Sequence, residues 1–205
     1  MPKYTTFTKV ENYALTDIDV TMQSQVEEWI DVAEKMIDNI TGRDFVADIA
    51  ATERKYDIER DLSSNALGEY EEAKQDFYVD DCVEITKVEI DDEEVVVGDY
   101  ITYPANSLPI ARIHLTDDSG LIFTVGEQNI HITAKWGYSA TCPADIILAA
   151  TILATGIMNY GKGKDAGMIR TETIGGYSVS YDTDLQWQNF QAVKSILEKY
   201  KKLTF

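Results

Sequence analysis

The sequence has 205 residues, of which 44% are hydrophobic and 26% are charged. These values are close to those of ordinary globular proteins, so they exclude a wholly disordered chain and predict one domain, or one domain with an insertion. The 36 acidic residues outnumber the 18 basic ones and leave a formal net charge of -18. Because proteins bind DNA by replacing its condensed counterions with lysine and arginine, so acidic a chain is disfavoured as a sequence-specific DNA binder.

The acidic excess leaves three interpretations open. The carboxylates can simply keep the surface soluble, they can face a partner with a basic surface, or they can line a channel through which DNA slides without sticking.

Residues 21–41 are predicted to form the first helix, because apolar residues recur there at steps of three and four. They are Val26, Trp29, Ile30, Ala33, Ile37 and Ile40. Ser24 and Glu27 have the spacing of a capping box, with Thr21 as the alternative cap. Gly42 is well placed to end the helix in a left-handed turn.

Between residues 52 and 136 the hydrophobic period shifts toward two, which predicts a run of short strands. The candidates are residues 83–90, 95–97, 100–103, 111–115, 121–125 and 130–136. The first changes phase between Ile85 and Val88, as a bulge would allow, and residues 91–93 form a turn. The last two are predicted to pair as a hairpin around residues 126–129.

One face of the predicted hairpin should be buried. Its residues on the second strand are Ile130, Ile132, Ala134 and Trp136.

Residues 144–160 are predicted to form a second helix, which begins after Pro143 with Thr141 or Cys142 as its cap. It is apolar nearly all round and should therefore lie at the centre of the helical layer. Its most apolar run, residues 146–158, falls short of the about 20 residues that cross a bilayer, so we expect a buried helix and no membrane partner.

Residues 161–167 are predicted to form a loop, and residues 169–181 an extended segment that is interrupted at residues 175–176. The last helix opens at residues 182–184. Its apolar face contains Trp187, Phe190, Val193, Ile196, Leu197 and Tyr200.

The predicted fold is α+β: a small helical bundle of three or four helices with an inserted antiparallel β-rich subdomain. Residues 1–51 supply the N-terminal segment and first bundle helix, and residues 52–140 the β-rich insert. Residues 141–205 supply the remaining bundle helices, the loop and the C-terminal tail.

The sequence contains cysteines, histidines and acidic runs, but none of them has the spacing of a familiar catalytic or metal-binding motif. Cys82 and Cys142 lack a nearby metal-ligand partner in the sequence and are interpreted as half-buried core residues. His114 and His131 lie in strand-like segments without a recognisable triad. The acidic runs at residues 80–81 and 91–94 lack the spacing of a calcium loop. We therefore predict no catalytic residues, no metal site and no cofactor.

Residues 156–162 match the first seven positions of a phosphate-binding loop, but Gly163 follows where Ser or Thr is required. The segment also ends a predicted helix, whereas a phosphate-binding loop precedes one. It is interpreted as a helix end.

Three stretches together resemble the head-tail connector, or adaptor, family of long-tailed bacteriophages. They are residues 40–45 after the first helix, residues 132–138 with 142–146 at the junction between the insert and the second helix, and residues 174–181 leading into the last helix. Their order and spacing cover nearly the whole chain.

This resemblance implies a structural, non-enzymatic virion protein. Subunits of that kind form a closed ring, here a dodecamer, beneath the portal protein, and they bind a stopper or tail-terminator protein below. DNA passes through the channel of the ring. The implied location is the neck of the virion, after assembly in the host cytoplasm.

The resemblance also implies that the C-terminal part contacts the portal. The residues concerned are Lys199, Lys201, Lys202, Leu203 and Phe205. An alternative is that the lysines only complement the helix dipole and that the tail is frayed. Lys162, Lys164 and Asp165 are candidates for a loop that meets a neighbouring subunit or the channel.

Two other functions stay open on the sequence. One is a different neck or tail-completion protein, and the other is a small β-rich hydrolase or carbohydrate-binding module.

Overall fold

The computed structural model describes residues 3–58, 75–161, 171–174, 177–180 and 183–202. The chain forms two compact units, a helical unit of Met1–Phe45 with Cys142–Phe205 and a β unit of Val46–Thr141. The described residues contain four α-helices, a six-stranded sheet and a separate pair of short strands. The α+β fold class predicted from the sequence is confirmed.

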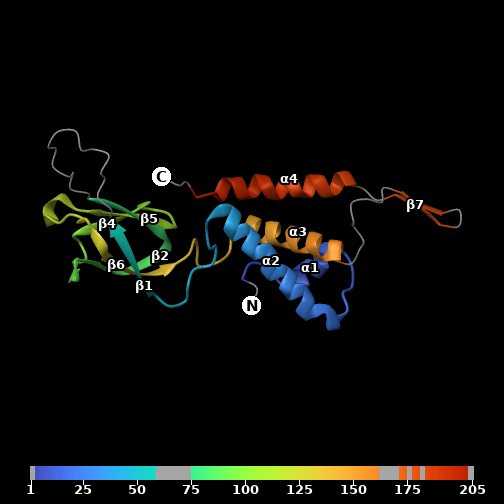
Figure 1. Cartoon of the computed structure of the whole chain (residues 1–205), viewed down its shortest axis with the longest axis horizontal. Helices are drawn as coiled ribbons and strands as arrows, with labels where there is room; N and C mark the ends of the chain where they lie inside the picture. Colours follow the sequence, from blue (N-terminus) through green and yellow to red (C-terminus); the bar gives the residue numbers. More distant parts are fainter. Residues whose placement is uncertain (1–2, 59–74, 162–170, 175–176, 181–182, 203–205) are drawn as a thin grey trace. The chain divides into compact units, whose positions relative to one another are not determined.

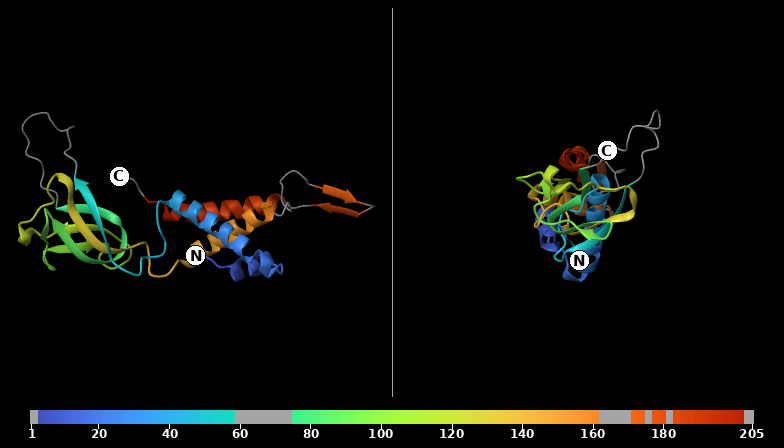
Figure 2. Two further views of the ribbon diagram at one scale, coloured as in Figure 1. Left: turned by 60° about the horizontal axis from the view of Figure 1, so that its bottom comes forward. Right: turned by 90° about the vertical axis from the view of Figure 1, so that its left-hand side faces the viewer.

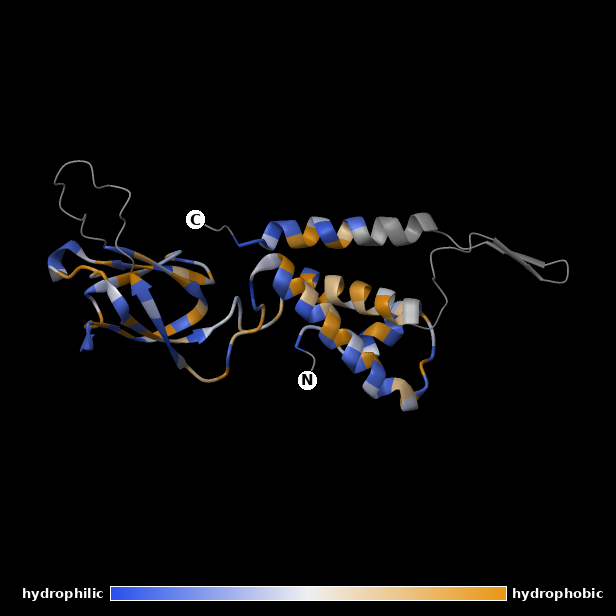
Figure 3. Cartoon of the chain, viewed as in Figure 1, coloured by the Kyte–Doolittle hydropathy of each residue, from blue (hydrophilic) through white to orange (hydrophobic). Residues whose placement is uncertain are grey.

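The helical unit is arranged around one central helix. Its α-helices are α1 (Phe7–Ala14), α2 (Gln23–Thr41), α3 (Ala144–Gly161) and α4 (Thr183–Tyr200). Helix α3 packs against each of the other three (Figures 1 and 2). Figure 3 shows that α3 is apolar along most of its length, whereas α2 carries both polar and apolar residues. The central position predicted for this helix is therefore correct.

The core between these helices is built from small and branched residues. Its buried members are Val10, Ile18, Val26, Ile30, Ala33, Ala154 and Met158. Because Ala33 and Ala154 carry only a methyl group, neighbouring helices can approach closely at these positions. None of the described helices is long and apolar enough to cross a membrane.

Helix α2 ends as predicted but begins differently. Gly42 is left-handed, with φ +68°, and its N–H donates to the carbonyl of Asp38 at 2.7 Å. The predicted capping box is wrong, because the chain enters α2 through a short 3-10 helix, η1 (Val20–Met22). Asp19 caps that turn by accepting from the N–H of Thr21 at 2.9 Å.

Helix α1 was not predicted from the sequence. Its only buried residue is Val10, and its eight residues are fewer than the about 11 over which a helical hydrophobic period is normally recognised. Thr6 begins the helix by accepting from the backbone N–H of Lys9 at 3.4 Å.

The β unit is built on a single antiparallel sheet. Its strands are β1 (Thr52–Ile58), β2 (Asp76–Ile90), β3 (Glu93–Glu94), β4 (Tyr100–Tyr103), β5 (Ile110–Leu115) and β6 (Gly126–Trp136). The order is β1-β6-β2-β5-β4, with β3 paired to β2. The predicted phase change in β2 is a true irregularity, since its register with β6 shifts between Cys82 and Glu84 and between Ile85 and Lys87.

One predicted strand pairing and one predicted strand are wrong. Residues 121–125 do not form a hairpin with β6, because β6 is hydrogen-bonded to β1 on one side and to β2 on the other. Residues 95–97 lie just after the short strand β3 and are not a strand themselves. The buried face predicted for β6 is correct; it contains Ile130, Ile132, Ala134 and Trp136.

The segment before α4 is an antiparallel pair of strands, β7 (Thr171–Ile174) and β8 (Tyr177–Ser180). Ile174 lies opposite Tyr177. The predicted interruption at residues 175–176 lies outside the described residues.

Candidate functional site

The end of α4 is the first candidate, because the residues predicted to contact a portal lie there. Lys199 and Lys201 are exposed, and Lys202 is half-buried. Leu203 and Phe205 lie outside the described residues. Lys199 is in the last turn of α4, where a cation suits the helix dipole.

Two hydrogen bonds to backbone carbonyls hold this end of α4 against the end of α2. The guanidinium Nε of Arg43 donates to the carbonyl of Tyr200 at 2.6 Å. The N–H of Lys202 donates to the carbonyl of Thr41 at 2.8 Å. Both acceptors are carbonyls of the last residue of a helix, so the segment after each helix donates to the end of the other.

The side chain of Tyr200 joins two more elements. Its hydroxyl donates to the carboxylate of Asp145, in the first turn of α3, with oxygen distances of 2.9 and 3.0 Å. Its ring packs edge-to-face on Phe45, with the centroids 5.3 Å apart. Phe45 is fully buried and makes a second edge-to-face contact, at 5.8 Å, with Tyr4.

We call the residues Tyr4, Arg43, Phe45, Asp145 and Tyr200 the α4 corner. They come from the N-terminal segment, the end of α2, the start of α3 and the end of α4. Elements that are distant in the sequence thus fix the last turn of α4 from several sides. Lys199 and Lys201 therefore lie next to a helix end that is held by hydrogen bonds and ring packing.

Two acidic side chains of α2, the buried Glu34 and the half-buried Asp38, bind the N-terminal segment. The carboxylate of Glu34, only 5% exposed, accepts from the backbone N–H groups of Lys3, Tyr4 and Thr5 at 2.8, 2.6 and 3.1 Å. The hydroxyl of Tyr4 donates to Asp38. Burial raises the pKa of Tyr4, and the pKa of Asp38 is also raised by burial, against the opposing effect of the Tyr4 hydrogen bond.

The predicted loop residues Lys162, Lys164 and Asp165 lie outside the described residues, so their role at a subunit or channel contact stays a prediction.

Both cysteines are free thiols. Burial raises the pKa of each to about 12, so neither is a ready thiolate at neutral pH. Cys82 is buried and Cys142 half-buried, which agrees with their interpretation as core residues.

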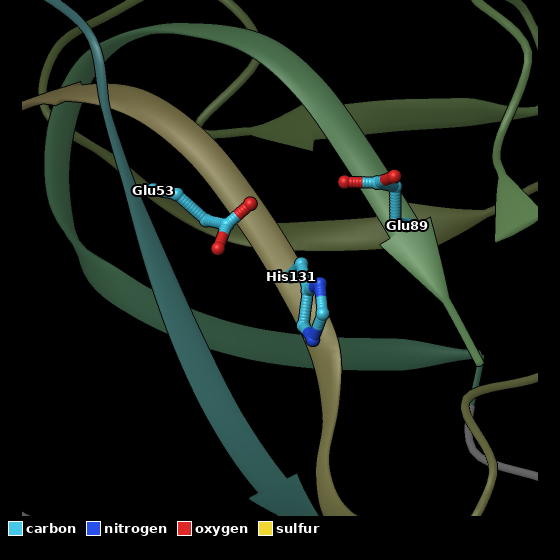
Figure 4. A group of neighbouring side chains, drawn as sticks. All are labelled: Glu53, Glu89 and His131. Carbon is cyan, nitrogen blue, oxygen red and sulfur yellow. The ribbon is translucent and has the colours of Figure 1, made fainter. Parts of the chain in front are cut away.

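A second cluster lies on the sheet, where Glu53, Glu89 and His131 come together (Figure 4). Sequence reasoning missed it because the three residues belong to β1, β2 and β6 and have no common spacing along the chain. Only the strand order and register could have revealed it. The other histidine, His114, bonds through Nδ1 to Asp76 at 2.9 Å, its register partner across β5 and β2.

No family model matches the sequence, and no curated protein matches it either. Solved structures of similar fold do exist. One is a chain in the "Neck of empty GTA particle computed with C6 symmetry", with a TM-score of 0.52, 11% identity, and coverage of 89% of this chain and 80% of that chain. Another is in the "Virion of native gene transfer agent (GTA) particle", with a TM-score of 0.50, 13% identity, and coverage of 96% and 90%. Both likenesses extend over most of the chain and establish a shared fold.

Proposed function

We propose that this chain is a structural, non-enzymatic neck protein of a phage-like particle, and that it acts as a head-tail connector between capsid and tail. The observation that carries the proposal is the fold shared with a chain of a gene transfer agent neck, which covers 89% of this chain and 80% of that one. The independent resemblance of residues 40–45, 132–138 with 142–146, and 174–181 to connector proteins leads to the same function.

The proposed assembly is a closed dodecameric ring. The neck that contains the similar chain was computed with C6 symmetry, and a ring of twelve equivalent subunits has a six-fold axis as well. Subunits related by rotation in such a ring meet through two different surfaces, so each copy binds a neighbour on both sides. In the mature particle the ring lies in the neck, and its assembly takes place in the host cytoplasm.

The proposed portal contact is the end of α4. Arg43, Thr41 and Asp145 hold the last turn in place, so Lys199 and Lys201 are presented from a fixed helix end. Lys199 and Lys201 are both exposed, and such a pair of cations suits an acidic partner surface. Lys202, Leu203 and Phe205 continue the proposed contact.

The acidic composition suits a channel protein. A ring of subunits that each carry a net charge of -18 repels the phosphate backbone, so DNA can pass without binding. The downstream partner in this proposal is a stopper or tail-terminator protein on the face away from the portal.

Electron microscopy of the purified full-length protein, alone and mixed with the portal of the same particle, tests this function. We expect closed rings, or rings seated on the portal, and assembly that occurs only on the portal also supports the proposal. A protein that stays monomeric and ignores the portal at high concentration would overturn it.

A further inference from the structure

The outward face of the sheet carries charged residues from three neighbouring strands. On β6 the side chains of Ile130 and Ile132 are buried, so His131 between them points to the opposite face. Glu89 of β2 lies directly opposite His131 in the register. On the other side Lys55 is opposite His131 and Glu53 is opposite Thr133, which makes Glu53 the diagonal neighbour of His131.

We infer that Glu53, Glu89 and His131 form a binding site for a divalent transition-metal ion that fastens the edge strand β1 to the centre of the sheet. Each side chain offers one ligand atom, and the three atoms lie within 4.8 Å of one another. Figure 4 shows the two carboxylates on either side of the imidazole. This site is independent of the proposed neck function.

The imidazole is already oriented by a partner outside the cluster. The Nε2 atom of His131 lies 2.8 Å from the backbone carbonyl of Gln128. A carbonyl can only accept, so Nε2 carries the hydrogen, and the neutral ring presents the lone pair of Nδ1 for coordination. Metal-binding histidines characteristically donate their other ring N–H to such an acceptor, which fixes the tautomer and the plane of the ring.

The carboxylates of the cluster are in contact with lysine ammonium groups. Lys87 contacts Glu89 at 2.7 Å and Glu94 at 4.0 Å, and Lys55 contacts Glu53 at 3.9 Å. These lysines show that the face attracts positive charge. Their side chains are 40% and 48% exposed, so both can turn into solvent when a metal ion takes their place.

A metal ion would stabilise the attachment of strand β1 to the sheet. Among the described strands β1 lies at the edge of the sheet, and residues 52–55 are all exposed. Only Ile58 is buried, with Tyr56 half-buried, so little apolar surface attaches the strand to the sheet. An ion that takes one ligand from each of β1, β6 and β2 would cross-link three strands.

The donor set favours one class of ion. Imidazole nitrogen suits Zn²⁺ and its first-row neighbours, whereas Mg²⁺ and Ca²⁺ prefer oxygen ligands alone. Three protein ligands also leave a position for water, as in open zinc sites. We therefore expect Zn²⁺ to bind and Mg²⁺ not to compete at equal concentration.

Isothermal titration calorimetry of the metal-stripped full-length protein with ZnCl₂ tests the site. The informative variants are Glu53→Gln, Glu89→Gln and His131→Gln, with Glu94→Gln as the matched control, because it removes one carboxylate beside Lys87 but none of the three ligands. We expect one Zn²⁺ per chain and a loss of affinity of about tenfold or more in each ligand variant. The control should change the affinity less than about twofold. Zinc binding that is absent, or unchanged in His131→Gln, would overturn the site.

Hydrogen exchange tests the fastening of β1 separately. In the wild type, Zn²⁺ should slow amide exchange in residues 52–56, and in folded His131→Gln it should not. Circular dichroism confirms folding of the variant, whose replaced side chain faces outward. Zinc that binds through the three residues but leaves exchange in β1 unchanged would contradict the structural role.

Discussion

The hydroxyl of Tyr200, in the last turn of α4, donates a hydrogen bond to the carboxylate of Asp145, in the first turn of α3, at 2.9 Å. Asp145 also accepts from the backbone N–H of Ile146 at 3.0 Å and lies where the α3 dipole favours an anion. One carboxylate therefore caps the start of the central helix and holds the end of the C-terminal helix.

Replacing Tyr200 with Phe tests this link. The substitution keeps the ring that packs on Phe45 but removes the hydroxyl, so Asp145 loses a partner. Because Tyr200 and Asp145 are half-buried, we expect the free energy of unfolding to fall by about 1 kcal/mol in urea denaturation. Tyr13→Phe, at a site that is 38% exposed, is the matched control and should be neutral. Equal stability of both variants would contradict the assigned role.

Replacing Glu34 with Ala tests the anchor of the N-terminal segment. The buried carboxylate accepts from three backbone N–H groups, and its removal leaves them without that acceptor. We expect a loss of about 2–4 kcal/mol in the free energy of unfolding. Amide exchange at Lys3, Tyr4 and Thr5 should become much faster, while exchange in α3 follows only the global stability. Unchanged protection of these three amides would exclude the anchor.

The sequence predicted elements whose signal is local. The apolar face of residues 21–41 predicted α2, and the nearly continuous apolar composition of residues 144–160 predicted α3. Gly42 indicated the end of α2, because a left-handed residue is favoured there. The phase change between Ile85 and Val88 likewise predicted the irregular register of β2.

Features that depend on distant partners could not be predicted in this way. Residues 126–129 are of the types that form hairpin turns, yet they begin β6, which pairs with β1 and β2. The residues of a turn do not indicate which distant strands will pair. The Tyr200 to Asp145 bond spans 55 positions in the sequence. The Glu53, Glu89 and His131 cluster requires the register of three strands, and α1, with eight residues, is too short for its period to be recognised.

The raised pKa of Asp38 predicts a pH dependence of stability. Burial is the main cause, and Asp44 and Glu34 act in the same direction, whereas the Tyr4 hydrogen bond and Lys3 oppose it. The folded state therefore holds the Asp38 proton more tightly than the unfolded state, whose pKa is near the ordinary 3.8. The resulting stabilisation is present below that value and is lost as the pH rises through the folded-state pKa.

The comparison with Asp38→Asn isolates this effect, because asparagine does not titrate and can still accept from the Tyr4 hydroxyl. We expect the unfolding free energy of the wild type, minus that of the variant, to fall as the pH rises above about 4 and then to level off. Urea denaturation over the acidic to neutral range measures the difference. A difference that grows with pH would contradict the raised pKa.

The lysines at the end of α4 provide a test of the portal contact. In the double variant Lys199→Gln and Lys201→Gln, two exposed charges are lost without any change to the α4 corner, so stability should stay within about 0.5 kcal/mol of the wild type. Affinity for the purified portal should fall by about tenfold, and its dependence on salt should weaken. Lys9→Gln on α1 also removes one exposed lysine and should bind like the wild type. Equal portal affinity of the wild type, the double variant and Lys9→Gln would show that Lys199 and Lys201 do not contribute to the portal contact.

The most direct test of the central claim is a cryo-electron microscopy reconstruction of the neck of the particle that contains this protein. The account predicts a closed ring of this chain beneath the portal, with the end of α4 against the portal and DNA passing through the ring. A neck reconstruction without this chain, from particles shown by mass spectrometry to contain it elsewhere, would contradict the account.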